Sequence, residues 1–294
     1  MLKRLLTLSA FALLTSCAHG ENSTAPEKST TPAMVAATPA PPATPVATPA
    51  PIAATPAAPT ATPYVDTAGH ELGRWELYFY NRVQKFKAEN ATLPKDRKNV
   101  VFLGDSLTEG FPTKTYFPTQ PVLNRGIVSD GANNLPGDQF KYRGILNRMD
   151  ECVYDCNPAL VILLIGTNDV GQGPGLKYWI DSEREIVDKI QARFPDAKIV
   201  LETLPPTGAA YKKNAFLNPR IIEYNGMIKE LAKEKNLPVV DVYNLYVGSD
   251  GLLPADLTGD GLHVKKAAYD RWAEALRPHI EALHLPAVED APKS

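Results

Sequence analysis

The sequence carries almost no net charge, and this argues against partners that bind through strong electrostatic attraction. Its 294 residues include 31 lysines and arginines against 33 aspartates and glutamates, which leaves a net charge of −2. A protein that binds nucleic acid usually presents a strongly basic domain or a basic stripe along one face. We therefore expect no nucleic-acid partner.

Cysteine is equally scarce. Of the three cysteines, Cys152 and Cys156 lie together in the run Cys-Val-Tyr-Asp-Cys. Two thiolates without further ligands at a suitable spacing are too few for a metal site, so we expect no metal. In an oxidising compartment this pair can close a small disulfide loop, and two free buried thiols fit the sequence equally well.

The sequence also lacks an apolar run long enough to span a membrane. A shorter apolar run near the N-terminus indicates export. Two basic residues precede the run from Leu5 to Leu14, which has the length of a signal-peptide core and is too short to span a bilayer. The run ends in Leu-Thr-Ser-Cys, which resembles the lipobox of bacterial lipoproteins. The resemblance implies a signal peptide over residues 1–16 and a lipidated Cys17 as the first residue of the mature chain. The alternative is an ordinary secreted signal peptide.

Lipidation of Cys17 would fix the chain to a membrane, because several acyl chains together anchor stably where one does not. Ala18 follows the cysteine at the position where, in bacterial lipoproteins, an aspartate favours retention in the inner membrane. The resemblance therefore implies the cell envelope as location, at the outer membrane, facing either the periplasm or the cell surface.

A proline-rich segment follows. Pro, Ala and Thr fill 33 of the 40 positions from 24 to 63. With few large apolar residues, this segment cannot bury enough surface to offset the entropy of ordering it, and its prolines favour extended conformations. We expect residues 17–63 to be a disordered tether, residues 64–285 one globular domain, and residues 286–294 a flexible tail.

Within the expected domain, short apolar runs alternate with helical stretches. The runs predict strands at residues 100–103, 160–165, 198–201 and 239–242, with a weaker one starting at 122–123. Helices are predicted at 70–90, 138–151, 176–193, 219–236 and 265–284, the fourth beginning with Asn218 as N-cap and Pro219 in its first turn. This alternation predicts an α/β fold whose parallel sheet is covered by helices on both faces. Such sheets bind ligands at the carboxyl ends of their strands.

Three short motifs follow expected strands, and a fourth lies just before the last expected helix. Ser106, in Gly-Asp-Ser-Leu, would sit on a turn into a helix, where backbone N–H groups can stabilise an oxyanion. Gly126 permits close backbone approach, so its N–H could donate to the same oxyanion. Asn168, in Gly-Thr-Asn-Asp, offers a side-chain amide. Read singly, each motif is equally an ordinary turn.

The fourth motif is Asp-Gly-Leu-His, which ends at His263. A histidine can take a proton from a serine and return it to a leaving group, and Asp260 could hold its other ring nitrogen. One Asp and one His are too few for a metal site. Asp256 is the rival partner of His263, at a less suitable spacing.

Together, in this order, the motifs are similar to those of the SGNH (GDSL) hydrolase family, which is named after a Ser, Gly, Asn and His in four such blocks. The resemblance spans residues 100 to about 280. It implies a flavodoxin-like three-layer sandwich of about five parallel strands. The Gly-x-Ser-x-Gly elbow of ordinary α/β-hydrolases is absent around Ser106, which argues against that fold.

The resemblance also implies a serine ester hydrolase with the catalytic residues Ser106, Asp260 and His263. Its oxyanion hole would comprise the N–H groups of Ser106 and Gly126 and the side chain of Asn168. It needs no cofactor. Asp105 is expected to be a structural hydrogen-bond acceptor in the turn, and Asp169 and Asp256 to be bystanders.

Substrate class is less constrained. An envelope location and a long tether favour a short acyl group, acetyl above all, on a carbohydrate. The alternatives are a lysophospholipase, lipase or thioesterase, an acyltransferase that uses the same triad, and a non-catalytic envelope-binding module. We expect a monomer whose partners are an acylated small molecule or glycan and, through the anchor, a membrane.

Overall fold

The computed structural model describes residues 72–137 and 143–288. These lie within one compact unit, residues 60–294. The predictions for the signal peptide, for Cys17, for the tether up to residue 63 and for most of the tail concern residues outside the described ranges. Within these ranges, no helix is both long and apolar enough to cross a membrane.

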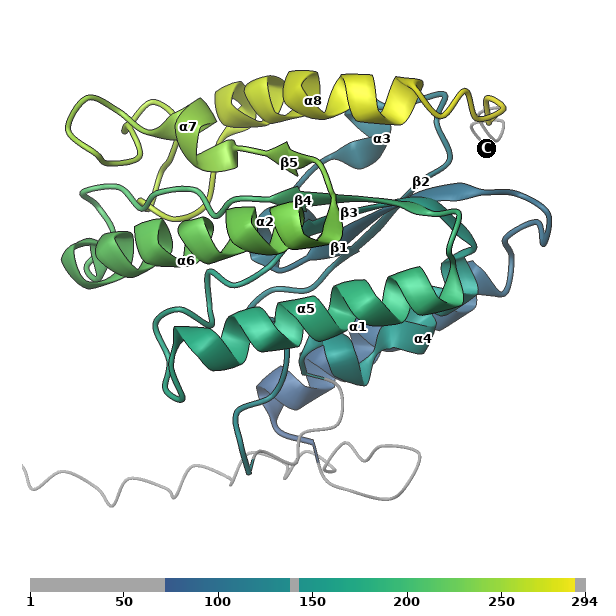
Figure 1. Ribbon diagram of the computed structural model, residues 1–294, viewed down its shortest axis with the longest axis horizontal. Helices are drawn as coiled ribbons and strands as arrows, with labels where there is room; N and C mark the ends of the chain where they lie inside the picture. Colours follow the sequence, from purple (N-terminus) through teal and green to yellow (C-terminus); the bar gives the residue numbers. More distant parts are fainter. Residues whose placement is uncertain (1–71, 138–142, 289–294) are drawn as a thin grey trace, which may run out of the picture. The chain divides into compact units, whose positions relative to one another are not determined.

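Five parallel strands form one sheet in the order β2-β1-β3-β4-β5 (Figure 1). Their bounds are β1 Asn99–Gly104, β2 Val122–Gly126, β3 Pro158–Leu164, β4 Lys198–Glu202 and β5 Val239–Val240. This is the strand order of flavodoxin-like folds, in which ligands bind where the order reverses, between β1 and β3. The predicted fold class is therefore confirmed.

The two central strands follow from their composition. Every residue of β1 is buried, and so is all of β3 except Ala159, which is partly buried. Continuous apolar runs of this kind belong to strands covered on both faces. The edge strand β2 gave a weaker signal because polar residues interrupt it: Arg125 is fully buried, and its guanidinium donates to Glu89 and Asn90, each at 2.6 Å.

Helices cover both faces of the sheet. In Figure 1, α1 (Arg74–Asn90), α4 (Met149–Cys152) and α5 (Leu176–Arg193) lie on one side, while α3 (Thr113–Tyr116) and α8 (Lys266–Glu281) lie on the other. The remaining helices are α2 (Ser106–Glu109), α6 (Asn214–Lys235) and α7 (Val242–Tyr246), with 3-10 turns at Ile145–Asn147 and Tyr154–Cys156. The predicted bounds of α5 are confirmed to the residue.

The predicted start of α6 is wrong. The helix begins at Asn214, so Pro219 lies inside it, and Asn218 does not cap it. The Asn218 side chain is buried instead: its Oδ1 accepts the Thr207 N–H at 2.7 Å, and its Nδ2 donates to the Thr207 carbonyl at 2.9 Å. The side chain of Asn218, which the local sequence suggested as a helix cap, thus binds the backbone of Thr207 instead.

The single helix predicted over 138–151 is also wrong in its described part. Residues 143–152 hold a 3-10 turn and then α4, because Gly144 adopts φ +87° and Arg148 adopts φ −136°, both outside the helical region. Strand β5 is shorter than predicted because Asp241 caps α7 at once, its side chain accepting from the Asn244 N–H. Of the two alternatives for Cys152 and Cys156, the structure has two free, buried thiols.

Candidate active site

A tight turn presents Ser106 at the carboxyl edge of the sheet. Strand β1 ends at Gly104, where a Cβ atom would lie 2.2 Å from both the Leu164 carbonyl oxygen and Thr108 Oγ1. Asp105 then caps α2, its buried Oδ1 accepting the Leu107 N–H at 3.0 Å. The predicted structural role of Asp105 is confirmed. Ser106, the first residue of α2, is left partly exposed.

The loop before α8 brings His263 to this serine. An isolated bridge between Thr258 and Val264 closes the loop, and Thr258 Oγ1 donates to the His263 carbonyl at 2.7 Å. His263 Nε2 lies 3.1 Å from Ser106 Oγ, although the two residues are 157 positions apart in the chain. The fold therefore brings together the segment after β1 and the loop before α8.

Asp260 completes a hydrogen-bonded relay. Its Oδ2 lies 2.7 Å from His263 Nδ1, while its Oδ1 accepts the N–H groups of Leu262 at 2.9 Å and His263 at 2.8 Å. Burial acts to raise the pKa of Asp260, but the hydrogen bonds from His263 and Leu262 outweigh it and hold the pKa at about 2. The ionised carboxylate accepts the Nδ1 proton, so Nε2 faces Ser106 with its lone pair. The rival, Asp256, is exposed, and the hydrogen bond to His263 is made by Asp260.

Asn168 reaches the same place from the loop after β3. Its Nδ2 donates to the Asp130 carbonyl at 2.9 Å and lies 3.5 Å from Asp105 Oδ2, next to the serine. A carboxamide nitrogen has two protons, and both have an acceptor here; the contact with Asp105 is the longer one, so its proton is the one that an oxyanion would take over. Asp169 is fully buried, and its Oδ2 accepts the Ala132 N–H at 2.8 Å, which gives it a structural contact rather than a place beside Ser106.

Gly126 does not offer the free donor that the sequence predicted. Its N–H already donates to Asn124 Oδ1 at 2.9 Å. The glycine is needed for packing, because a Cβ there would lie 2.2 Å from the Glu109 backbone nitrogen and 2.8 Å from the Asp105 carbonyl oxygen. The oxyanion role assigned to Gly126 is corrected accordingly.

A residue that sequence reasoning missed, Ser129, offers such a donor. It adopts φ +63°, a left-handed conformation that few residues other than glycine take up. Among the residues that the structure describes, no hydrogen bond uses the N–H of Ser129 or of Ser106. Ser129 directly precedes Asp130, whose carbonyl accepts the Asn168 amide. No sequence signal marks a positive φ at a serine, so only the structure reveals this group.

A buried ion pair fixes this loop. Arg148 and Asp130 are both inaccessible to solvent, with Arg148 Nε donating to Asp130 Oδ2 at 2.8 Å. The same guanidinium donates to the carbonyls of Arg125 at 3.0 Å and Gly104 at 3.3 Å, the ends of β2 and β1. Removing one partner of such a pair usually costs about 3–5 kcal/mol, because the other charge is left buried. The pair therefore holds the loop to both strand ends.

Known proteins are similar to this chain over most of the residues that form the site. The model of the GDSL-like lipase/acylhydrolase family matches residues 102–271. Over 165 residues the chain is 28% identical to a multidomain esterase from Ruminococcus flavefaciens; the match covers 51% of this chain but only 20% of that protein. The chain thus spans about a fifth of that relative's length.

Solved structures share the fold. A GDSL-like lipase from Bacteroides thetaiotaomicron VPI-5482 is similar at a TM-score of 0.57 and 28% identity, over 70% of this chain and 99% of that one. An acetyl xylan esterase is similar at a TM-score of 0.52 and 20% identity, over 62% of this chain and 99% of that one. At the latter identity, the likeness shows the fold alone.

Proposed function

This chain belongs to the GDSL-like lipase/acylhydrolase family, and on that premise we propose that it is a carboxylic ester hydrolase that removes short acyl groups, acetyl above all, from a carbohydrate. The observation that carries the reaction type is the relay in which Asp260 bonds to His263 and His263 bonds to Ser106. Side chains in this geometry can activate a serine hydroxyl for attack on a carbonyl carbon.

In the proposed mechanism, Ser106 Oγ attacks the ester carbonyl and its proton passes to His263 Nε2. Asp260 stabilises the resulting imidazolium through Nδ1. The tetrahedral oxyanion accepts hydrogen bonds from Asn168 Nδ2 and from the N–H groups of Ser106 and Ser129, the last in place of Gly126. His263 then protonates the leaving alcohol. Water enters, gives its proton to His263 and releases the acyl group, which restores the serine.

The proposal of a short acyl group on a carbohydrate is supported by the exposure of the site to solvent. The side chains of His263 and Asp260 are 48% and 55% exposed. A bulky, polar alcohol can approach such a site, whereas a long acyl chain needs an apolar groove to bury its methylenes. Four cavities of about 280 to 440 Å³ in the described part of the chain are lined by residues other than the triad.

The test uses the full chain, p-nitrophenyl esters of increasing acyl length, and Ser106→Ala as control. We expect turnover that is highest on acetate, falls with acyl length and is lost in Ser106→Ala. Acetylated xylo-oligosaccharides and other acetylated glycans are then assayed for free acetate. A preference for long acyl chains would overturn the short-acyl proposal, and transfer of acetyl to an added sugar would indicate a transferase. Near-normal activity of Ser106→Ala would refute the assigned nucleophile.

We further propose that the chain is lipid-anchored in the cell envelope through Cys17. The support is the Leu-Thr-Ser-Cys sequence directly after the apolar run. Metabolic labelling with a palmitate analogue should mark the wild-type chain and not Cys17→Ser. If Cys17→Ser stays in the membrane fraction and carries the label, the anchor lies elsewhere.

A further inference from the structure

Helix α1 lies outside the segment that the family model matches, yet it packs on the loop that leads to Ser129. Four buried residues of α1, Phe79, Tyr80, Val83 and Phe86, form an apolar cluster with Ile127. This cluster is separate from the main core, which surrounds the sheet. Helix α1 therefore shares buried apolar surface with the segment between Gly126 and Ser129.

Glu109, the last residue of α2, forms polar contacts both with α1 and with the segment before Ser129. Its Oε2 accepts the N–H of Val128 at 2.6 Å. Its Oε1 accepts the hydroxyl of Tyr78 at 2.5 Å and lies 3.4 Å from Arg82 Nε. Both Tyr78 and Arg82 belong to α1. One carboxylate thus joins α1 to the peptide that immediately precedes Ser129.

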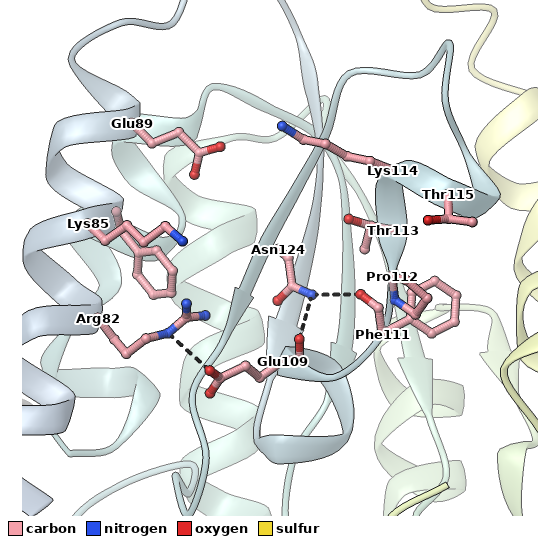
Figure 2. A pocket seen from close by; sticks show the side chains of 11 residues that line it. Arg82, Lys85, Glu89, Glu109, Phe111, Pro112, Thr113, Lys114, Thr115 and Asn124 are labelled. Carbon is pink, nitrogen blue, oxygen red and sulfur yellow. Dashed lines mark hydrogen bonds and ion pairs between the residues drawn. The ribbon is translucent and has the colours of Figure 1, made fainter. Parts of the chain in front are cut away.

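Arg82 holds the same segment a second time. While its Nε faces Glu109, its second terminal nitrogen (Nη2) donates to the Gly126 carbonyl at 2.8 Å. Arg82 and Glu109 both line a cavity of about 360 Å³, and Figure 2 shows their side chains meeting there. The two side chains are each less than one-fifth exposed, so water screens this ion pair weakly.

Tyr78 is suited to be a lasting donor in this cluster. Burial, together with the neighbouring Glu109 carboxylate, raises its pKa to about 12. The phenol therefore keeps its proton across the physiological range and continues to donate to Glu109. Deleting only its oxygen would remove one hydrogen bond and leave the ring in place.

From these contacts, and on the basis of the proposed function, we propose that Tyr78 and Arg82 of α1 are positioning residues for the oxyanion hole. They hold Glu109, Glu109 holds the Val128 N–H, and the fixed Val128 sets the direction of the following N–H, that of Ser129. Helix α1 is then part of the catalytic unit as well as of the fold. Neither side chain touches the reacting atoms.

The expected effect is on turnover rather than on substrate binding. Loss of one oxyanion donor typically costs a hundred- to a thousandfold in kcat, and a donor that is displaced but still present costs less. We expect Arg82→Met to lower kcat for p-nitrophenyl acetate about 10- to 100-fold, with KM changed less than threefold. Tyr78→Phe should lower kcat about 3- to 10-fold, since Arg82 still holds Glu109.

Two control variants separate positioning from stability. Ile190→Ala opens a cavity under α5 in the main core, outside the apolar cluster of α1, and Lys87→Met removes the ion pair between Lys87 of α1 and Glu151 of α4. Thermal unfolding is measured for all four variants. We expect the controls to keep kcat within twofold of wild type even if Ile190→Ala unfolds at a temperature as low as Arg82→Met does.

A second readout reports on the oxyanion hole directly. A phenylboronic acid adds to the serine and forms a tetrahedral adduct, so its inhibition constant should rise in Arg82→Met and Tyr78→Phe in proportion to the loss of kcat. If both variants keep kcat and the inhibition constant within twofold of wild type, the positioning role is refuted. An equal loss of kcat in Ile190→Ala and Arg82→Met would show that lowered stability alone causes it, and would refute the positioning role. An inactive wild-type chain would instead contradict the proposed function itself.

Discussion

Replacing Asp260 with asparagine tests the relay more sharply than removing the side chain. Asp260 Oδ1 accepts two backbone N–H groups, those of Leu262 and His263, while Oδ2 faces His263 Nδ1 at 2.7 Å. In Asp260→Asn, the two N–H groups require the amide oxygen on their side, which turns the amide NH₂ toward Nδ1. Nδ1 must then accept, so the ring proton moves to Nε2. That proton points at Ser106, and the imidazole can no longer act as a base.

The magnitude follows from which tautomer remains available. In the chymotrypsin-type triad, the wrong tautomer lowers kcat about 10⁴-fold, or about 5.5 kcal/mol of transition-state stabilisation at 1.36 kcal/mol per tenfold. Asp260 is 55% exposed here, so water can enter when the side chain is shortened. In Asp260→Ala, a water molecule can accept from Nδ1 and the productive tautomer returns. We expect kcat of Asp260→Asn to fall by 10³- to 10⁴-fold, and Asp260→Ala to retain at least tenfold more activity.

The assay is initial-rate hydrolysis of p-nitrophenyl acetate by both variants, with unfolding temperatures measured in parallel. Because the pKa of Asp260 is held near 2, its carboxylate stays ionised throughout the assay range. Its contribution to stability is present above its ordinary pKa of 3.8 and is lost only as the pH falls toward 2. Wild-type activity in Asp260→Asn would remove Asp260 from the relay. Equal or lower activity in Asp260→Ala would refute the tautomer argument.

Three further variants test separate parts of the structure. Asn168→Ala should lower kcat on p-nitrophenyl acetate by about 10²- to 10³-fold with little change in KM, and an unchanged kcat would remove it from the oxyanion hole. Gly126→Ala places a Cβ atom 2.2 Å from the Glu109 backbone nitrogen, so the free energy of unfolding in urea should drop by about 1–3 kcal/mol; an unchanged midpoint would contradict the packing role. Burial raises the pKa of Glu202 to about 8, although the hydrogen bond that Trp272 donates to it acts in the opposite direction. Unfolding therefore releases the proton of Glu202, and the stability of the fold decreases as the pH rises from 4.5 to 8. The unfolding temperature of Glu202→Gln should therefore fall less between pH 6 and pH 9 than that of wild type, and parallel curves would exclude this carboxyl as a cause.

The central part of the fold could be predicted because it depends on apolar pattern. Strands β1 and β3 are continuous buried runs, and α5 has a buried face that recurs with helical period. Strand β2 was seen only at its first two residues, since Asn124 and Arg125 are polar. Their partners, in α1 and in the segment after Ser106, are distant in sequence. A local pattern does not contain that information.

The site shows the same division. That Ser106, Asn168, Asp260 and His263 lie close together could be predicted, because each stands in a short motif directly after a strand or before a helix. Gly126 was misassigned because a glycine at a strand end serves equally for packing. Ser129 was missed because its left-handed backbone results from the loop's tertiary contacts. The predictions of the helix boundaries near Asn214 and Arg148 are wrong for the same reason, because hydrogen bonds of buried side chains determine these boundaries.

The distance along the chain between Ser106 and His263 has a consequence in time. A ribosome adds roughly 5–20 residues per second, so the 157 residues between nucleophile and base take on the order of 10–30 s to make. During that interval the part of the chain already made comes to contain the sequences of all five strands and still lacks the base, because His263 follows the last of them. The Ser106–His263 pair therefore cannot form before residue 263 has been added, wherever the chain then folds. A fragment cut anywhere before residue 263 would be silent toward esters, however well its sheet had formed.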